Sequence, residues 1–129
     1  MPTSEVEPTG ATKQKVAVVI YSNITVEPAS RAYRAFGFVA ELLAHGDDVV
    51  VVFDGGGSAT LAAVLEPGHK LHRPWQRAAP ALRGVCSHCA RSYGVADVLT
   101  AAGVPMLTED HGHASLRDLL LEGRQIITF

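Results

Sequence analysis

The run DVVVVF at residues 48–53 points to the fold, because four consecutive valines and a phenylalanine leave no polar face for solvent. A short, continuous, β-branched run of this kind is typical of a strand buried on both faces, as in a parallel sheet. KVAVVIY at residues 15–21 has the same character and predicts a second such strand. Between them, apolar residues recur at spacings of three and four from Ala32 to Leu43, which predicts an amphipathic helix. This succession is a strand–helix–strand unit with a right-handed crossover.

The second half of the chain continues the alternation in shorter segments. Ser58 is a candidate N-cap for a helix that ends at Leu65, and an irregular helical segment with two prolines follows over residues 69–82. Beyond it we expect a strand at 82–86, a helical stretch at 88–102 interrupted near Gly94, a strand at 104–108, a helix at 116–121 capped by Ser115, and a strand at 125–129. The whole pattern predicts an α/β fold, a three-layer α/β/α sandwich of about five mostly parallel strands.

Length and composition favour one domain over residues 15–129, since the 129 residues are 47% hydrophobic and 19% charged. Eleven Lys and Arg against thirteen Asp and Glu give a net charge of −2, without a basic run, so nucleic acid is not an expected partner. Residues 1–14 have no apolar segment and are predicted to be a flexible tail rather than a signal peptide. No later apolar run approaches the ~20 residues of a membrane span. We therefore expect a cytoplasmic protein without a membrane partner.

The loop DGGGS at residues 54–58 follows the second predicted strand. In open α/β sheets, ligands bind beyond the carboxyl ends of the strands, where helix N-termini converge. Glycines there let backbone amides approach an anion, so Asp54, Gly55, Gly56, Gly57 and Ser58 are candidate ligand-binding residues. The glycine register does not match a dinucleotide fingerprint. A plain turn is the competing interpretation of the same loop.

Cys86 and Cys89 are the only cysteines, and they form a C-x-x-C pair that ends the third predicted strand and opens a helix. Three residues apart on a first helical turn, the two thiols share a face and lie close enough for a disulfide or for joint metal ligation. The positive end of a helix dipole lowers the pKa of a thiol and makes it nucleophilic. The pair is therefore a candidate catalytic site, with two small buried core residues as the alternative.

Three kinds of thiol chemistry compete for this pair. A structural zinc site usually has a second ligand pair, but the chain has no third cysteine, and His88 lies between the two, so no metal and no cofactor is expected. A thioredoxin-type redox couple suits the strand-to-helix position, although the downstream proline of that fold has no clear counterpart. A persulfide carrier, in which Cys86 holds a transferable sulfur, uses the same thiolate exchange chemistry.

Histidines supply the remaining candidates for the rim of a pocket. His69 and His72 are three apart and share a helical face if their segment is helical. His111 lies in the loop EDHGH at residues 109–113, after the fourth predicted strand. Neutral imidazole binds metals or accepts protons, whereas a solvated acidic loop is the alternative for residues 109–113. We include His69, His72 and His111 as candidate ligand-binding residues.

Five segments taken together resemble DsrE-like proteins, a superfamily of sulfur-relay proteins. These segments are KVAVVIYS (15–22), VVVVFDGGGSATL (49–61), HKLHRPW (69–75), GVCSHCARSYGV (84–95) and LLLEGRQIITF (119–129). They cover essentially the entire domain and stand in the order that the family shows. The most specific part is FDGGGS combined with a cysteine at the end of the third strand, followed by a short helix and Gly-Val.

The resemblance implies a fold, an assembly state and a chemistry. It implies an α/β/α sandwich that forms a homo-oligomer, a trimer or hexamer, and a loop cysteine that carries sulfane sulfur. The position of that cysteine matches Cys86, and Cys89 matches the second cysteine of members with C-x-x-C, a resolving or auxiliary thiol. Partners would then include a sulfur-donor or acceptor protein. The alternative function is a non-catalytic module that binds a small ligand or a partner, with structural cysteines.

Overall fold

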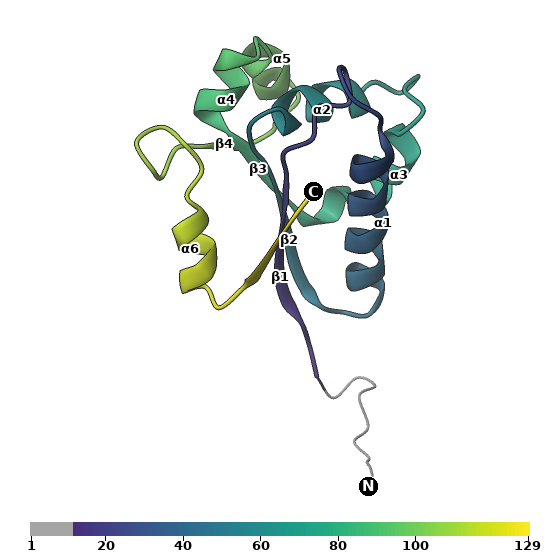
Figure 1. Cartoon of the computed structure of the whole chain (residues 1–129), viewed down its shortest axis with the longest axis vertical. Coiled ribbons are helices and arrows are strands. Elements are labelled where there is room, and N and C mark those ends of the chain that lie inside the picture. Colours follow the sequence, from purple (N-terminus) through teal and green to yellow (C-terminus); the bar gives the residue numbers. More distant parts are fainter. Residues whose placement is uncertain (1–11) are drawn as a thin grey trace, which may run out of the picture.

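Five parallel strands form one sheet in the order β4-β3-β2-β1-β5 in the computed structural model, which describes residues 12–129 (Figure 1). The strands are β1 Lys15–Ile20, β2 Asp48–Phe53, β3 Leu82–Cys86, β4 Met106–Leu107 and β5 Gln125–Thr128. Of the tail expected over residues 1–14, residues 1–11 lie outside the described part. Lys13 and Gln14 hydrogen-bond to His45 O and Asp47 Oδ1, both at 2.9 Å.

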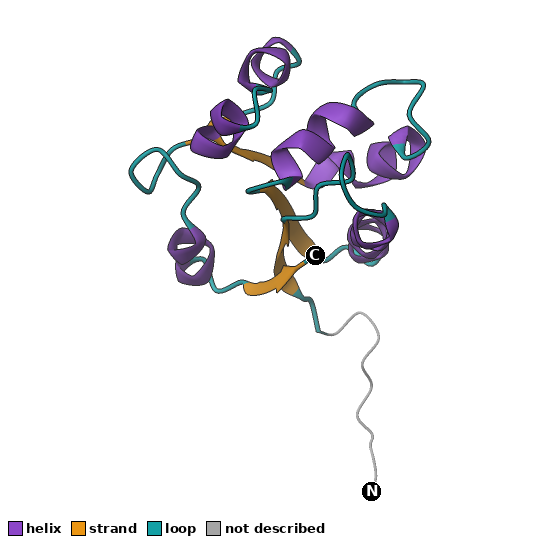
Figure 2. Ribbon diagram, turned by 45° about the horizontal axis from the view of Figure 1, so that its top comes forward, coloured by secondary structure: helices purple, strands orange, loops and turns teal. Residues whose placement is uncertain are grey.

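Helices cover both faces of the sheet, which confirms the three-layer α/β/α sandwich (Figure 2). The helices are α1 Ser30–Ala44, α2 Gly57–Val64, α3 His72–Ala78, the 3-10 turn η1 Ala79–Ala81, α4 Ser87–Ser92, α5 Ala96–Ala101 and α6 Leu116–Leu121. Helices α1 and α3 pack together on one face, and α6 lies on the other (Figure 1). Helices α2, α4 and α5 gather near the carboxyl ends of the strands. Within residues 12–129, no helix has the length and apolar character that crossing a membrane requires.

Side chains of the central strands alternate between two apolar clusters, as burial on both faces requires. Val16, Val18 and Ile20 of β1 belong to the larger cluster with α1 and α3, whereas Ala17 and Val19 belong to the smaller one beside α6. All five are at most 2% exposed. The same alternation along β3 places Val85 in the larger cluster and Cys86 in the smaller one.

Three aromatic side chains anchor the larger cluster. The ring of Trp75 in α3 lies 5.5 Å from that of Phe36 in α1 and 5.4 Å from that of Phe53 in β2. These separations are in the range of favourable tilted and edge-to-face contacts. The smaller cluster has no comparable aromatic group and is covered chiefly by α6, a helix of six residues. The thin cover on this face leaves room for the cavity described below.

Several sequence-based boundaries change in the structure. The N-cap role of Ser58 is wrong, because α2 already begins at Gly57 and the Ser58 hydroxyl donates to Gly55 O at 2.8 Å instead. The interruption expected near Gly94 is confirmed, because the stretch at 88–102 is two helices and Gly94, with a φ of 71°, lies between them. The strand expected at 104–108 pairs over two residues only. The cap at Ser115 is confirmed, since its side chain accepts a hydrogen bond from Asp118 N.

An ionic network ties α6 to the sheet. The carboxylate of Glu122 accepts hydrogen bonds from both terminal nitrogens of Arg83, at 2.7 and 2.9 Å, and from Arg124 Nε at 2.7 Å. Arg124 is buried and also donates to Asp48 Oδ1 at 2.9 Å. Hydrogen bonds from Arg83 and then Arg124 lower the pKa of Glu122 to about 2. The charged form of Glu122 therefore stabilises the fold.

Replacing Glu122 with glutamine is expected to lower the free energy of unfolding at neutral pH by about 1 kcal/mol, a modest value because the side chain is partly exposed and screened. The pKa of Glu122 lies lower in the folded chain than in the unfolded chain. Its contribution is therefore full above the unfolded pKa of about 4.3 and is lost as pH falls through about 2. Urea unfolding of wild type and Glu122→Gln, from neutral pH down to about pH 2, measures the effect, with exposed Glu41→Gln as the control. A difference that stays constant with pH would contradict this account.

Candidate functional site

The carboxyl edge of the sheet brings together residues from three segments that are far apart in the chain. Asp54 directly follows β2, Cys86 is the last residue of β3, and His113 lies in the loop after β4. Strands β2, β3 and β4 are neighbours in the parallel sheet, so their carboxyl ends lie side by side. This edge is where open α/β sheets place their ligand sites.

Cys86 faces the thinly covered side of the sheet. Its side chain is 0% exposed and belongs to the smaller apolar cluster with Val19 and Val52, because the alternation along β3 directs it away from α1. Its Sγ lies 3.6 Å from Nδ1 of His113. In apolar surroundings, a polar partner at this distance is the group that stabilises a thiolate.

Cys89 follows one turn later in α4 and is half-buried. Its thiol donates to Asp54 Oδ1 at 3.4 Å. Burial, followed by hydrogen bonding to Cys86, raises the pKa of Cys89 to about 12, and hydrogen bonding to Asp54 adds to the rise. Cys89 is therefore a protonated thiol at neutral pH, and the two cysteines differ in character although they belong to one motif.

His113 is directed inward by a two-residue turn. Asp110 and His113 exchange backbone hydrogen bonds of 2.9 and 2.8 Å, and His111 and Gly112 between them have φ values of 53° and 89°. Two positive φ values in a two-residue connection are typical of a type I′ hairpin turn. The turn is held against α4, because His88 N donates to Gly112 O at 3.0 Å and the rings of His88 and His113 lie 4.3 Å apart.

Cys86, Cys89 and His113 form a compact cluster, in which one ligand atom from each lies within 4.8 Å of the other two. No disulfide joins the cysteines, which are both free thiols. Two thiols beside an imidazole suit two kinds of chemistry. They support nucleophilic thiol exchange, and they are ligands for borderline-soft cations.

Asp54 is the residue of the DGGGS loop that contacts this cluster. Its Oδ1 accepts from Gly55 N at 2.8 Å as well as from Cys89, and its Oδ2 accepts from the Tyr21 hydroxyl at 3.4 Å. The amides of Gly57 and Ser58 donate to loop carbonyl oxygens at 2.8 and 3.1 Å. Those amides are engaged in the turn, so the loop positions Asp54 more than it offers an anion cradle.

The three predicted histidines lie elsewhere. His69 Nδ1 accepts from Leu71 N at 3.0 Å, and His72 Nδ1 lies 2.8 Å from Val64 O, so both serve the connection between α2 and α3. The His111 side chain is 97% exposed at the tip of the turn, where it pairs with Asp110. The structure brings none of the three to the cysteines. His113, two residues from a predicted position, is the histidine that sequence reasoning missed.

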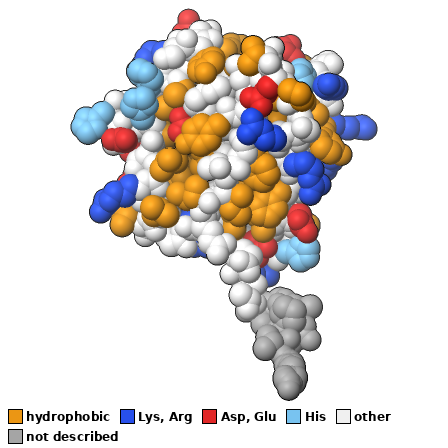
Figure 3. Space-filling view, in the orientation of Figure 1, with side chains coloured by type: hydrophobic (Ala, Val, Ile, Leu, Met, Phe, Trp, Pro, Cys, Tyr) orange, Lys and Arg blue, Asp and Glu red, His pale blue; other side chains and the backbone are white. Residues whose placement is uncertain are grey.

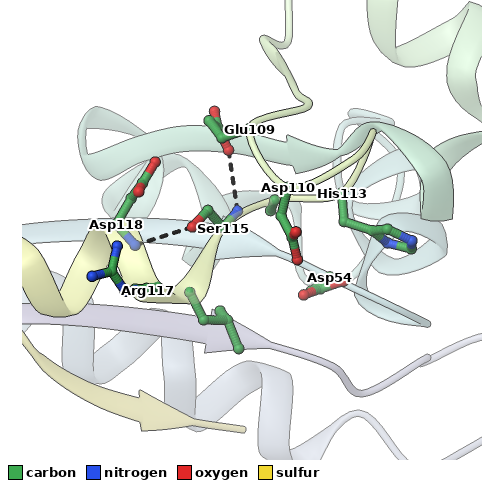
Figure 4. Close-up of a pocket in the computed structure, with 9 residues that line it drawn as sticks. Asp54, Glu109, Asp110, His113, Ser115, Arg117 and Asp118 are labelled. Atoms are coloured by element: carbon green, nitrogen blue, oxygen red, sulfur yellow. Dashed lines mark hydrogen bonds between the residues drawn. The ribbon is translucent and has the colours of Figure 1, made fainter.

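A cavity of about 720 Å³ opens beside the cluster (Figure 4). It is lined by Asp54, Glu109, Asp110, His113, Ala114, Ser115, Leu116, Arg117 and Asp118. Asp54 and His113 connect it to the cysteines, since each contacts one of the two thiols. Four carboxylates against one guanidinium make the lining acidic, and Figure 3 shows histidine and acidic side chains beside one another on this side of the molecule. Such a lining disfavours small free anions.

Comparison with known proteins identifies the family of the chain. The model of the DsrE/DsrF-like family matches residues 14–129, which is nearly the whole described part. No curated protein and no solved structure matches the chain. The parallel five-stranded sheet and the cysteine at the end of β3 agree with the resemblance drawn from the sequence. The chain therefore belongs to the DsrE/DsrF-like family.

Proposed function

We propose that this protein carries sulfane sulfur on Cys86 as a persulfide and passes it to an acceptor thiol. Membership of the DsrE/DsrF-like family supports a role of the sulfur-relay type in general. The observation that carries the specific proposal is the contact of 3.6 Å between Cys86 Sγ and His113 Nδ1, with the second thiol in the same cluster.

Each transfer is a thiolate exchange that leaves the overall oxidation state unchanged. The Cys86 thiolate attacks the outer sulfur of a donor persulfide, forming a new S–S bond. The S–S bond of the donor breaks, and its electron pair leaves with the donor thiolate. An acceptor thiolate then attacks the outer sulfur on Cys86, and the Cys86 thiolate is released. No external oxidant or reductant is required.

The neighbouring groups have separate roles in this proposal. His113 stabilises the anionic sulfur on Cys86 through its ring nitrogen. Cys89, a thiol whose pKa is raised to about 12, is the auxiliary thiol and not the attacking group, and it donates its hydrogen bond to Asp54. The acidic cavity disfavours a free inorganic anion as the sulfur donor. A trimer or hexamer, implied by the resemblance, stays a prediction.

Incubation of the reduced protein with cysteine hydropersulfide tests the function. We expect a mass gain of one sulfur atom per chain, measured by intact-protein mass spectrometry and reversed by a thiol acceptor. Cys86 and Cys89 lie in the same peptide, so fragmentation of that peptide should place the added sulfur on Cys86. Absence of a gain in the folded wild type would overturn the proposal and favour the binding module, a function that the complete burial of Cys86 also suits.

A further inference from the structure

We infer that Cys86, Cys89 and His113 also form a binding site for Zn²⁺, with the fourth coordination position open toward the cavity. The three ligand atoms already lie within 4.8 Å of one another. They come from β3, α4 and the hairpin turn after β4, so the fold and not a local motif assembles them. The inference concerns metal binding and does not depend on sulfur transfer.

The spacing of the ligands suits tetrahedral zinc. Zn–S bonds of about 2.3 Å and Zn–N bonds of about 2.05 Å, at a tetrahedral angle, place sulfur and nitrogen about 3.6 Å apart. The Cys86 Sγ to His113 Nδ1 distance is 3.6 Å. A zinc ion would therefore fit between these two atoms without separating them.

Charge and surroundings favour the same ion. Two thiolates neutralise a divalent cation, so the occupied site carries no net charge from ligands and metal in its partly buried position. Each thiol that binds as thiolate releases its proton. The ring of His113 packs beside the ring of His88, with the ring centroids 4.3 Å apart, and this contact limits the rotation of the His113 ring.

The fourth position has access to a ligand. Within the described chain, the cluster consists of three residues, which leaves one of the four tetrahedral positions without a protein ligand from the cluster. Asp54 Oδ1, at 3.4 Å from Cys89 Sγ, is an oxygen atom next to the cluster. Asp54 and His113 also line the cavity of about 720 Å³. Three protein ligands with one open position are typical of reactive zinc sites, whereas structural sites are closed by four.

Zinc and persulfide would exclude each other, because both use Cys86 Sγ. An ion bound to that sulfur withdraws electron density from the thiolate and blocks the approach of the donor, whereas a persulfide on Cys86 turns the thiolate sulfur into an S–S sulfur, which is a weaker zinc ligand. Occupied zinc would therefore switch off sulfur loading. This consequence rests on the proposed function, unlike the site itself.

Zinc titration of the reduced, metal-free full-length protein tests the site, with a chromophoric chelator as competitor. We expect one zinc per chain in the wild type. His113→Ala should weaken binding by about 100-fold or more, since loss of even an outer-shell partner costs 10–100-fold. His111→Ala is the matched control, because His111 lies in the same turn but is 97% exposed, and it should bind as wild type. Cobalt substitution should give thiolate charge-transfer bands and the visible bands of a tetrahedral ion.

The outcomes separate the two proposals. A substoichiometric trace of zinc in the wild type, or equal affinity of His113→Ala and His111→Ala, would overturn the metal site. Sulfur loading of the chelator-treated protein is measured in parallel. Loading without zinc binding overturns the metal site alone, whereas zinc binding without loading overturns the sulfur-carrier function alone. Undiminished loading of the zinc-saturated protein would refute mutual exclusion.

Discussion

Replacing Gly57 with alanine is expected to lower the free energy of unfolding by about 4 kcal/mol, one of the largest effects of a single methyl group in this chain. A Cβ at this position would lie 1.9 Å from Ile20 O and 2.8 Å from Ile20 C. Both atoms belong to the backbone of β1, an interior strand that pairs with β2 and β5, so neither moves without disturbing strand pairing. The start of α2 would have to shift instead, which would draw Asp54 away from Cys89.

Gly37→Ala provides the control for this substitution. Gly37 lies inside α1, and a methyl group added there would meet no atom within 4 Å beyond its own stretch of helix, so alanine should raise stability by up to about 1 kcal/mol through helix propensity. Urea unfolding followed by circular dichroism measures both variants. Similar stability of Gly57→Ala and wild type would show that the first turn of α2 has more freedom than these contacts imply.

Much of the fold is predictable because buried parallel strands have an unmistakable composition. KVAVVIY and DVVVVF specify β1 and β2 to within a residue. The residues of β4 could not be defined in this way, since Met106 and Leu107 pair only with β3, and the sequence around them shows no periodicity. The start of α2 was missed for another reason. Gly57 approaches the β1 backbone, and a close approach of this kind has no sequence signature beyond the glycine itself.

The candidate site was predictable in part. The C-x-x-C spacing and the strand before it locate Cys86 and Cys89, and the glycine loop locates Asp54. The choice between His111 and His113 depended on the turn chemistry of Asp-His-Gly-His, in which two positive φ values place His111 at the exposed tip. Recognising Asp110–His113 as a two-residue hairpin would have selected His113. Its contact with Cys86 joins two strand ends, and no local pattern predicts such a contact.

Cys86→Ser is expected to abolish sulfur loading, whereas Cys89→Ser retains it. Both thiols lie in one cluster, so proximity to the donor does not separate them. Their partners do, because Cys86 faces the ring nitrogen of His113 and Cys89 donates to the Asp54 carboxylate. Burial, followed by hydrogen bonding to Cys86, raises the pKa of Cys89 to about 12, and the acceptor carboxylate of Asp54 adds to this rise because it stabilises the thiol form. Only Cys86 then has surroundings that support an attacking thiolate.

Intact mass after incubation with cysteine hydropersulfide distinguishes the two variants, once circular dichroism and thermal unfolding have shown that both are folded. Serine is nearly isosteric with cysteine, so loss of the sulfur nucleophile and not a packing defect should determine the result. Loading of Cys86→Ser with no loading of Cys89→Ser would reverse the assignment and make the more accessible thiol the carrier. Loss in both variants would instead indicate that the two sulfurs act together. Sulfur loading of Cys89→Ser, in which Cys86 is the remaining thiol, would therefore identify Cys86 at the end of β3 as the carrier.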